Sequence, residues 1–369
     1  MIHFMLPMLL LAQDVDEVEL PPELTGEFVP KPGFKLYGEY LVWWLRRAYA
    51  PPILTAGTAA SQGVLGQPGT RVIYGDEWLE TRHDDRFIGG RFGAEWMHRS
   101  GEFGLEGRAF FLERDSTYKT IKWRTDPLMA LSYKDASTGR ESSIVISGED
   151  ATRGLLSGGF VGYSRVELFG QEINGVVPLR SHGHWKVDAL AGARFMQLRD
   201  RYHHTATNWE TPANQVLTGI IDNYRYHNAF YGGQIGLKGE SQWNRVSLQA
   251  RGAIALGADA QTAKIWGESI VHTPTSRTVT PTGLYVQRAN TGTFTNCNFD
   301  AVGEVAVNLG FDFTHWLRGY MGYTFLYWAD PVRAASQVQR NINFDNQPVT
   351  FNGDPFWAQG MNFGFEIHW

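Results

Sequence analysis

Residues 357–369 alternate between two kinds of side chain. Large and mostly apolar residues, ending on Trp369, hold the odd positions, and small or polar residues hold the even ones. A period of two places the two sets on opposite faces of a β-strand. Taken alone, the pattern fits either a lipid-facing strand of a membrane barrel or a half-buried strand of a secreted sandwich. Similar runs upstream favour the barrel.

Ten segments have this pattern at the length that crosses a membrane, about nine or more residues. They are 34–45, 87–98, 102–112, 159–171, 184–198, 228–240, 243–257, 299–312, 316–328 and 357–369. We therefore predict an all-β fold, a single closed antiparallel transmembrane β-barrel of about ten strands over residues 34–369. The first strand should pair with the last, because a closed sheet leaves no unpaired edge in lipid.

The connections between these segments fall into two length classes that alternate along the chain. The short ones are 99–101, 172–183, 241–242 and 313–315, and the long ones are 46–86, 113–158, 199–227, 258–298 and 329–356. Short periplasmic turns and long extracellular loops are typical of outer-membrane barrels, whereas a sandwich has no reason to sort its connections. A count of twelve strands stays open, because 142–147 and 263–266 also alternate. We interpret both as extensions of long strands above the membrane.

Composition supports the same class of protein. The 369 residues include 22 Phe, 15 Tyr, 13 Trp and 41 Gly, yet no run of 18 apolar residues occurs, which excludes spanning helices. The net charge of −5 indicates no nucleic-acid partner. A single cysteine permits no intrachain disulfide. We expect a protein of the bacterial outer membrane that contacts membrane lipid and is inserted by the barrel assembly machinery.

The N-terminal residues read as two further segments. Residues 1–12 are apolar and end on Ala12, which resembles the later part of a signal peptide without its positively charged start. Residues 13–33 are acidic and rich in proline, so they bury too little apolar area to offset their ordering entropy. We predict a periplasmic linker there.

The alternation also assigns the two faces of each strand. Apolar residues from Leu36 to Phe311, with Val166 and Leu168 among them, should face lipid. Aromatic residues near strand ends suit the membrane interfaces. The candidates are Trp44, Trp96, Trp185, Trp243, Tyr327 and Trp369.

The opposite, lumenal face should be charged, with acidic and basic residues in equal number. The basic set is Lys35, Arg91, Arg108, Arg165, Lys186, Arg194, Lys238, Arg245, Arg251 and Arg318. The acidic set is Glu39, Glu95, Glu102, Glu106, Glu167, Asp188, Glu240, Glu304, Asp312 and Glu366. A ten-strand barrel is narrow, and unpaired buried charges are costly, so we expect a lumen blocked by ion pairs. Neighbouring strands offer Glu95 with Arg108 and Asp188 with Arg165.

Catalytic or metal-binding chemistry has little support in the sequence. The histidine groups at 182–184 and 203–204 are expected at opposite ends of the barrel, as solvated turn residues. Acidic and histidine residues at the extracellular rim would be the candidates for a rim hydrolase, but no spacing is diagnostic. These are Asp84, Asp85, Asp200, His203, His204 and Asp222. We expect no enzyme, no cofactor and no metal.

Several segments resemble one bacterial family, the putative beta-barrel porin family seven. They are 38–44, 63–70, 89–93, 230–236, 319–328 and 357–366, in the same order as in the family. The resemblance implies an outer-membrane barrel and supplies no functional residues. A passive channel with a narrow lumen and a structural or surface-binding barrel that acts through its long loops both remain open. Neither the solute nor the loop partner can be read from the sequence.

Overall fold

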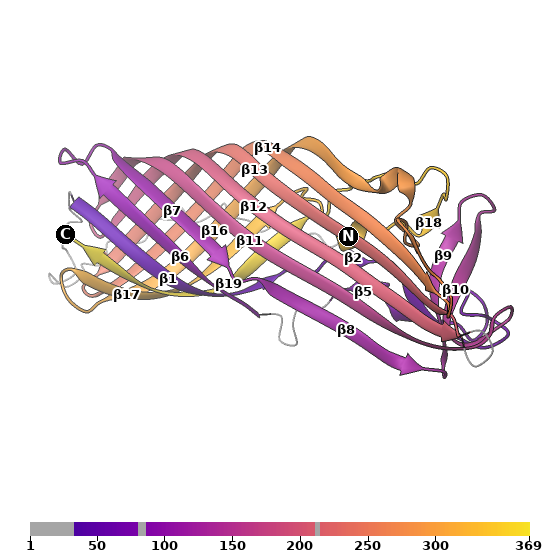
Figure 1. The fold of residues 1–369 in the computed structure, drawn as a ribbon. Coiled ribbons are helices and arrows are strands. Elements are labelled where there is room, and N and C mark those ends of the chain that lie inside the picture. The colour runs from indigo at the N-terminus through magenta and orange to yellow at the C-terminus, as the bar shows by residue number, and fades with distance from the viewer. Residues whose placement is uncertain (1–32, 80–85, 211–214) are drawn as a thin grey trace.

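The computed structural model describes residues 33–79, 86–210 and 215–369. The predicted signal segment, residues 13–32 of the predicted linker, Asp84 and Asp85 lie outside the described residues. Ten antiparallel strands form a hydrogen-bonded ring (Figure 1). In ring order they are β1 (Gly33–Leu45), β6 (Arg86–Met97), β7 (Gly104–Leu112), β11 (Gly154–His182), β12 (Trp185–Glu210), β13 (Leu217–Trp243), β14 (Val246–His272), β16 (Gly292–Asp312), β17 (Leu317–Trp328) and β19 (Phe356–His368).

Strands β1 and β19 close the ring. They pair over eleven residues, with Tyr40 opposite Phe363. The backbones of Phe34 and Trp369 exchange two hydrogen bonds of 3.0 Å at the end of this pair. The predicted single closed barrel of ten strands is confirmed. Residues 263–266 lie within β14, as expected, and do not form a separate strand.

Four neighbouring strands are much longer than a membrane requires. Strands β11 to β14 have 29, 26, 27 and 27 residues, against the roughly 9–11 that cross a bilayer. Their extra length rises beyond the short strands at the loop end of the barrel, opposite the end with the tight turns (Figure 1). We call these the loop end and the turn end.

The extra length corrects three predicted connections. Residues 172–182 belong to β11, so the turn there is only Gly183 and His184. Most of the predicted loop 199–227 is paired strand, with residues 211–216 as the connection between β12 and β13. Residues 258–272 likewise continue β14. In 199–227 and 258–272 the prediction failed because it looked for apolar residues on the outer face, which is polar outside the membrane. In 172–182 the outer face is apolar, with Ile173, Val177 and Leu179 exposed, and the prediction missed the continuing strand.

Smaller strands cover the loop end. A sheet of β3 (Leu54–Gly57), β4 (Arg71–Tyr74), β9 (Leu128–Asp135), β10 (Arg140–Asp150) and β18 (Asn341–Ile342) forms a cap. Residues 142–147 therefore belong to the β9–β10 hairpin, and their prediction as an extension of a long barrel strand was wrong. The other strands are β2 (Tyr49–Ala50), β5 (Glu77–Trp78), β8 (Asp115–Arg124), which pairs with β11, and β15 (Arg277–Thr280), which pairs with β14.

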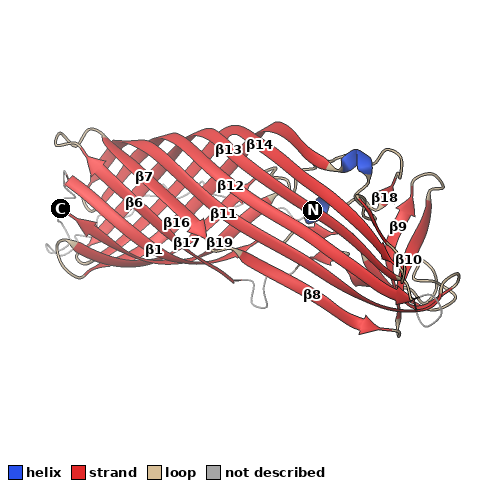
Figure 2. Ribbon diagram, viewed as in Figure 1, coloured by secondary structure: helices blue, strands red, loops and turns tan. Residues whose placement is uncertain are grey.

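Helical structure in the described residues is confined to two single turns of 3-10 helix, Arg288–Asn290 and Ala335–Gln337 (Figure 2). No helix in this part of the chain is long and apolar enough to cross a membrane.

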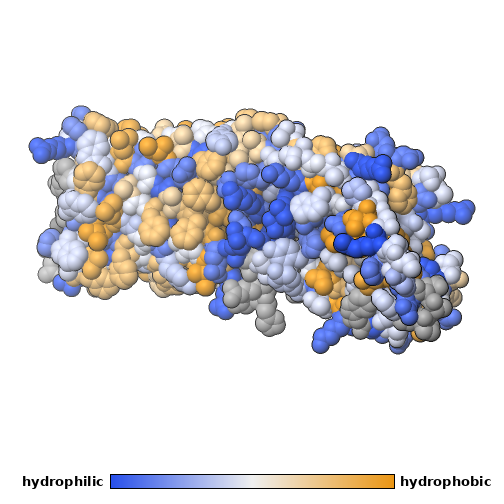
Figure 3. All heavy atoms as spheres, in the orientation of Figure 1, coloured by the Kyte–Doolittle hydropathy of each residue, from blue (hydrophilic) through white to orange (hydrophobic). Residues whose placement is uncertain are grey.

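The outer surface near the turn end carries an apolar band (Figure 3). Exposed apolar side chains such as Ile235 (71 %), Phe92 (60 %) and Val305 (56 %) belong to it. The six interface candidates all lie on outward-facing positions or at strand ends. Trp96, Trp185, Trp243 and Trp369 are at the turn end, and Trp44 and Tyr327 are at the other end of their strands.

Candidate functional site

The lumen near the turn end is filled by a network of ion pairs, which we call the lumen network. Its inward-facing members come from all ten ring strands. They are Lys35, Glu39, Arg91, Glu95, Glu106, Arg108, Glu172, Lys186, Asp188, Arg194, Lys238, Glu240, Arg251, Glu304, Arg318 and Glu366.

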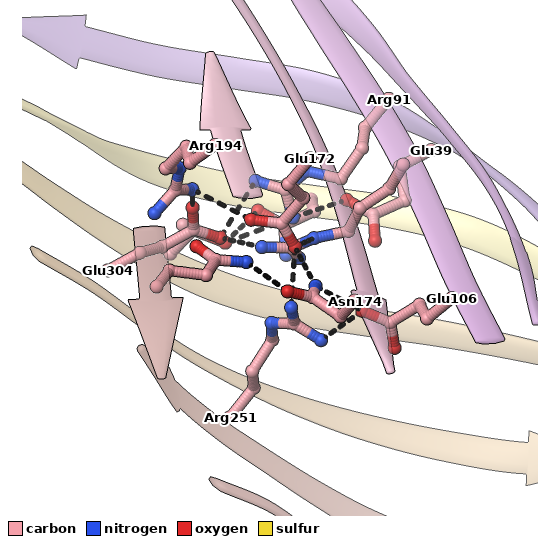
Figure 4. A network of polar contacts seen from close by, with 12 residues as sticks. Glu39, Arg91, Glu106, Glu172, Asn174, Arg194, Arg251 and Glu304 are labelled. Carbon is pink, nitrogen blue, oxygen red and sulfur yellow. Dashed lines mark hydrogen bonds and ion pairs between the residues drawn. The ribbon is translucent and has the colours of Figure 1, made fainter. Parts of the chain in front are cut away.

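The network spans the barrel from wall to wall. Arg108 on β7 contacts Glu172 at 2.5 Å and Glu304 on β16 at 2.6 Å. Strands β7 and β16 are five strands apart in a ring of ten, so this pair crosses the full lumen. Glu304 also binds Arg194 and lies 3.9 Å from Arg91, and its side chain is 1 % exposed (Figure 4).

Further pairs cross the lumen beside this centre. Arg251 on β14 lies 2.5 Å from both Glu106 and Glu172. Lys238 on β13 lies 2.8 Å from Glu95 and 3.5 Å from Glu106. Because each of these charges is largely buried, its partners offset a desolvation cost of several kcal/mol.

An apolar layer lies next to the network on its loop-end side. Its inward-facing residues are almost fully buried: Leu41, Trp43, Leu45, Phe87, Phe110, Leu112, Val166, Leu168, Met196, Leu198, Phe230, Ala255, Val302, Leu326, Trp328, Phe356 and Ala358. The rings of Trp43 and Phe110 are 5.5 Å apart, and those of Phe230 and Trp328 are 6.1 Å apart. The Arg91 guanidinium sits 5.3 Å from the Trp43 ring and joins the layer to the network.

The connection between β17 and β19 folds into the lumen above the apolar layer. Arg333 is 1 % exposed, and its Nε donates to Asp200 Oδ2 at 2.6 Å. Its Nη1 donates to the carbonyl oxygen of Arg46 at 2.9 Å. The backbone N–H of Val332 donates to Asn228 Oδ1 at 2.8 Å, and the Asn228 amide donates back to the Val332 carbonyl at 2.9 Å. The contacts hold this connection between opposite walls.

Replacing Arg333 with Ala should release this connection. The substitution leaves the buried Asp200 carboxylate without its partner, which typically costs about 3–5 kcal/mol. We expect much faster trypsin cleavage after Arg340 in the folded, purified protein. Arg288→Ala, which removes an exposed arginine elsewhere at the loop end, should leave the cleavage rate unchanged. Equal cleavage rates for Arg333→Ala and wild type would contradict the anchoring role.

The cap closes the loop end with a large hydrophobic cluster. Tyr202 and Tyr224 from the barrel wall pack there with Tyr285 and Leu131, all at 2 % exposure or less. The Tyr285 hydroxyl donates to the Ser132 carbonyl at 2.7 Å and so ties the cap to the connection that precedes β16. Burial raises the pKa of Tyr74 in this cluster to about 12. The lumen is therefore occupied in turn by the lumen network, by the apolar layer, and by the β17–β19 connection together with the cap cluster.

Four residues that were predicted to line the lumen lie elsewhere in the structure. Arg165 and Glu167 point outward and pair with each other at 2.6 Å, while Val166 and Leu168 point inward. The faces of β11 were therefore inverted, because its outer surface is polar at this height and its lumenal surface is apolar. Glu102 and Arg245 lie exposed in turns. The other predicted lumen residues face inward or, for Asp312, lie at the turn end beside Arg318 at 2.6 Å.

The predicted partners were also wrong. Glu95 pairs with Lys238 and not with Arg108, and Asp188 lies 3.9 Å from Lys186 and 4.0 Å from Lys238. Glu95 and Lys238 reach across the lumen, whereas the prediction considered neighbouring strands. Arg165 points outward and therefore cannot meet Asp188. Glu172, which contacts three arginines, was missed because it was placed in a turn. Glu172 lies at an even-numbered position, like the inward-facing residues from Ser164 to Asn174. This spacing could have revealed that the strand continues.

The histidine pair at the loop end differs from the solvated turn residues predicted. His204 is fully buried, with Nε2 3.2 Å from Asp222 Oδ2. Asp222 accepts backbone hydrogen bonds from Leu284, Tyr285 and Val286 at 2.7–3.3 Å. The rim candidates Asp200 and Asp222 therefore hold loops in place, and His203 lies on the face of β12 opposite His204. His184 does lie in a tight turn, and His182 directly precedes that turn. No group of three potential metal-ligating side chains occurs among the described residues.

The closed ring, its apolar outer band and its inward charges define a transmembrane β-barrel. The chain belongs to the putative beta barrel porin-7 family, whose model matches residues 36–369. The protein is therefore an outer-membrane β-barrel of a bacterial cell, with the turn end in the periplasm and the loop end outside. No curated protein matches the chain.

Solved structures with a similar fold are distant. The outer membrane protease OmpT from Escherichia coli is 12 % identical, with a TM-score of 0.39 over 94 % of this chain and 100 % of that one. A Pseudomonas aeruginosa FadL homologue is 9 % identical, with a TM-score of 0.22 over 93 % and 91 %. The CymD monoaromatic hydrocarbon channel is 7 % identical, with a TM-score of 0.20 over 92 % and 89 %. Likenesses this distant assign no activity, and the fold rests on the strand pairing itself.

Proposed function

We propose that the lumen is closed to diffusing solutes and that the protein acts at the cell surface through its loop end. The carrying observation is the Arg108 side chain, which contacts carboxylates on opposite walls of the barrel. A passive channel would need these contacts to open, together with the apolar layer above them. The family name points to a porin, and that alternative predicts a different outcome in the experiment below.

The space left in the network supports closure. A cavity beside Lys35, Arg91 and Tyr320 has a volume of about 60 Å³, and another beside Arg108 and Gln171 has about 10 Å³. Such volumes hold a few waters at most. Wide aqueous channels are typical of barrels with 16 or more strands.

The loop end offers the surface for a structural or binding role. Strands β11 to β14 carry it well beyond the apolar band, and the cap stabilises it. Residues 273–282 are mostly exposed and rich in threonine, and residues 291–296 are similar. Surfaces of this kind bind through hydroxyl and amide groups. Because the loop end lies outside the cell, the proposed partner is extracellular.

Planar-bilayer recording tests the closure. Wild type should show no large, steady conductance. Replacing Arg108 and Arg194 with Ala removes contacts of the network but leaves the apolar layer, so conductance should stay low. Adding Trp43→Ala, Trp328→Ala and Arg333→Ala should raise it clearly, because the network, the apolar layer and the anchor of the β17–β19 connection are then all weakened. Arg165→Ala, on the outer surface, serves as the matched control.

One result would speak against this proposal, and one control is needed. A large, stable conductance of the wild-type protein that none of these substitutions changes would favour the porin alternative. The folded state of every variant should be checked by its heat-modifiable gel mobility, so that a leak from unfolded protein is not scored as a channel.

A further inference from the structure

A row of four cations crosses the outer surface of the four long strands. Arg165, Arg201, Arg225 and Lys264 lie directly opposite one another on β11, β12, β13 and β14. Their strand neighbours are buried in the barrel, so the four side chains face outward. We call them the cation row. Like charges directly opposite in a sheet destabilise it, so the row calls for compensating anions.

The chain itself supplies little compensation. Glu167 is shared by Arg165 at 2.6 Å, Arg114 at 2.7 Å and Arg199 at 3.7 Å. Within the described part of the chain, no carboxylate forms an ion pair with the other three members of the row. The Arg225 guanidinium stacks 4.3 Å from the Trp266 ring, and its buried Nε has no hydrogen-bond partner. Most of the positive charge of the row is therefore not neutralised by the described part of the chain and is available to an external anion.

An apolar groove lies on the membrane side of the cation row. It has a volume of about 1010 Å³ and opens on the lipid-facing wall. Its floor is made of small residues such as Gly107, Ala193 and Gly233, and Phe195 and Tyr231 stand beside them. A volume of this size lies at the upper end of the range for ligand sites, about 300–1,000 Å³.

The groove and the charges adjoin each other. Arg201 of the cation row is six residues from Phe195 along β12, which is about 20 Å of extended chain, and Arg199 lies between them. In Figure 3 a strongly hydrophilic patch borders the apolar band on the face where β11 and β12 run. The border lies on the loop-end side of the band, which is the outer leaflet of the membrane.

We propose that the cation row and the groove together bind one phosphorylated, multiply acylated lipid of the outer leaflet. Its phosphates would lie against Arg201, Arg225 and Lys264, and its acyl chains would fill the groove. Free phosphate has no apolar part that would bind in the groove. A second copy of the chain docked symmetrically would bring another cation row against the first. Since the site lies outside the lumen, it is independent of the proposed closure.

Two pairs of variants test the two halves of the site. Arg201→Gln with Arg225→Gln weakens the cation row, and Arg277→Gln, an exposed cation on β15, is its control. Gly233→Leu fills the groove, since a Cβ there meets only a backbone oxygen at 4.0 Å. Gly252→Leu is the control, because it also adds a side chain in open space but does not line the groove.

The measurement is binding of fluorescent, bisphosphorylated lipid A to the purified full-length protein in mixed micelles, followed by anisotropy. The double arginine variant should bind about thirtyfold more weakly, given about 1 kcal/mol for each of the two cations near a charged membrane surface. Gly233→Leu should also weaken binding, and both controls should match wild type. Inorganic pyrophosphate should not displace the lipid.

Several results would overturn the proposal. Equal binding of dephosphorylated lipid A would remove the role of the cation row. Displacement by pyrophosphate would indicate a site for free phosphate. A dimer of the wild-type protein that Gly233→Leu abolishes would make the groove an interface between copies. Unchanged lipid binding by both test variants, with folded barrels confirmed by gel mobility, would leave no site at this position.

Discussion

Replacing Glu304 with Ala should destabilise the barrel by about 3–5 kcal/mol or more. Glu304 lies against Arg91, Arg108 and Arg194, and its side chain is 1 % exposed. Its loss leaves three guanidinium groups near one another with less negative charge to offset them. Removing one partner of a buried ion pair costs more than the pair itself contributes, because the remaining charges stay buried.

Urea unfolding in detergent, followed by the shift between folded and unfolded gel mobility, measures this effect. Glu304→Gln keeps the side-chain shape but not the charge, and should be nearly as destabilising if charge is the cause. Glu268→Ala, on an outward position of β14, provides the control and should leave the midpoint unchanged. A midpoint for Glu304→Ala equal to wild type would refute a central role for Glu304 in the network.

Deleting residues 365–369 should keep the protein out of the outer membrane. The last residues of β19 pair with β1 on one side and with β17 on the other, for example Phe365 with Gly38 and with Gly319. Their loss exposes unpaired backbone groups of both neighbours to lipid, at several kcal/mol for each group. Glu366, which binds Lys35 at 2.7 Å and Arg318 at 3.3 Å, is lost as well.

Membrane fractionation and heat-modifiable mobility measure the outcome in cells. A second arm separates two reasons for failure. Phe365→Ala with Trp369→Ala keeps the backbone pairing but removes the terminal aromatics that we expect the barrel assembly machinery to read. If this variant refolds in detergent yet fails to insert in cells, recognition is lost. If the truncated chain refolds and inserts normally, strand closure does not depend on these residues.

The sequence predicted most of the architecture because alternation is strict wherever one face of a strand meets lipid. The ten strands and the closure of β1 on β19 follow from that constraint, whereas three of the connections were predicted with the wrong lengths. Inward charges such as Arg108, Lys238 and Glu304 were found for the same reason, since a charge on a lipid-crossing strand must point away from lipid.

Above the membrane the same constraint disappears, and there only the tertiary structure decides which side chains point outward and which point into the lumen. The outer face of β11 meets water, so Arg165 points out and Val166 points in, the reverse of the prediction. The cation row could not be seen in a net charge of −5, because it arises from the register of four consecutive strands, which places residues 24 to 39 positions apart opposite one another. The cross-lumen partner of Arg108 depends on the ring bringing β7 opposite β16. Alternation along one strand carries no information about which residues of neighbouring strands lie opposite it or which residues it meets across the lumen.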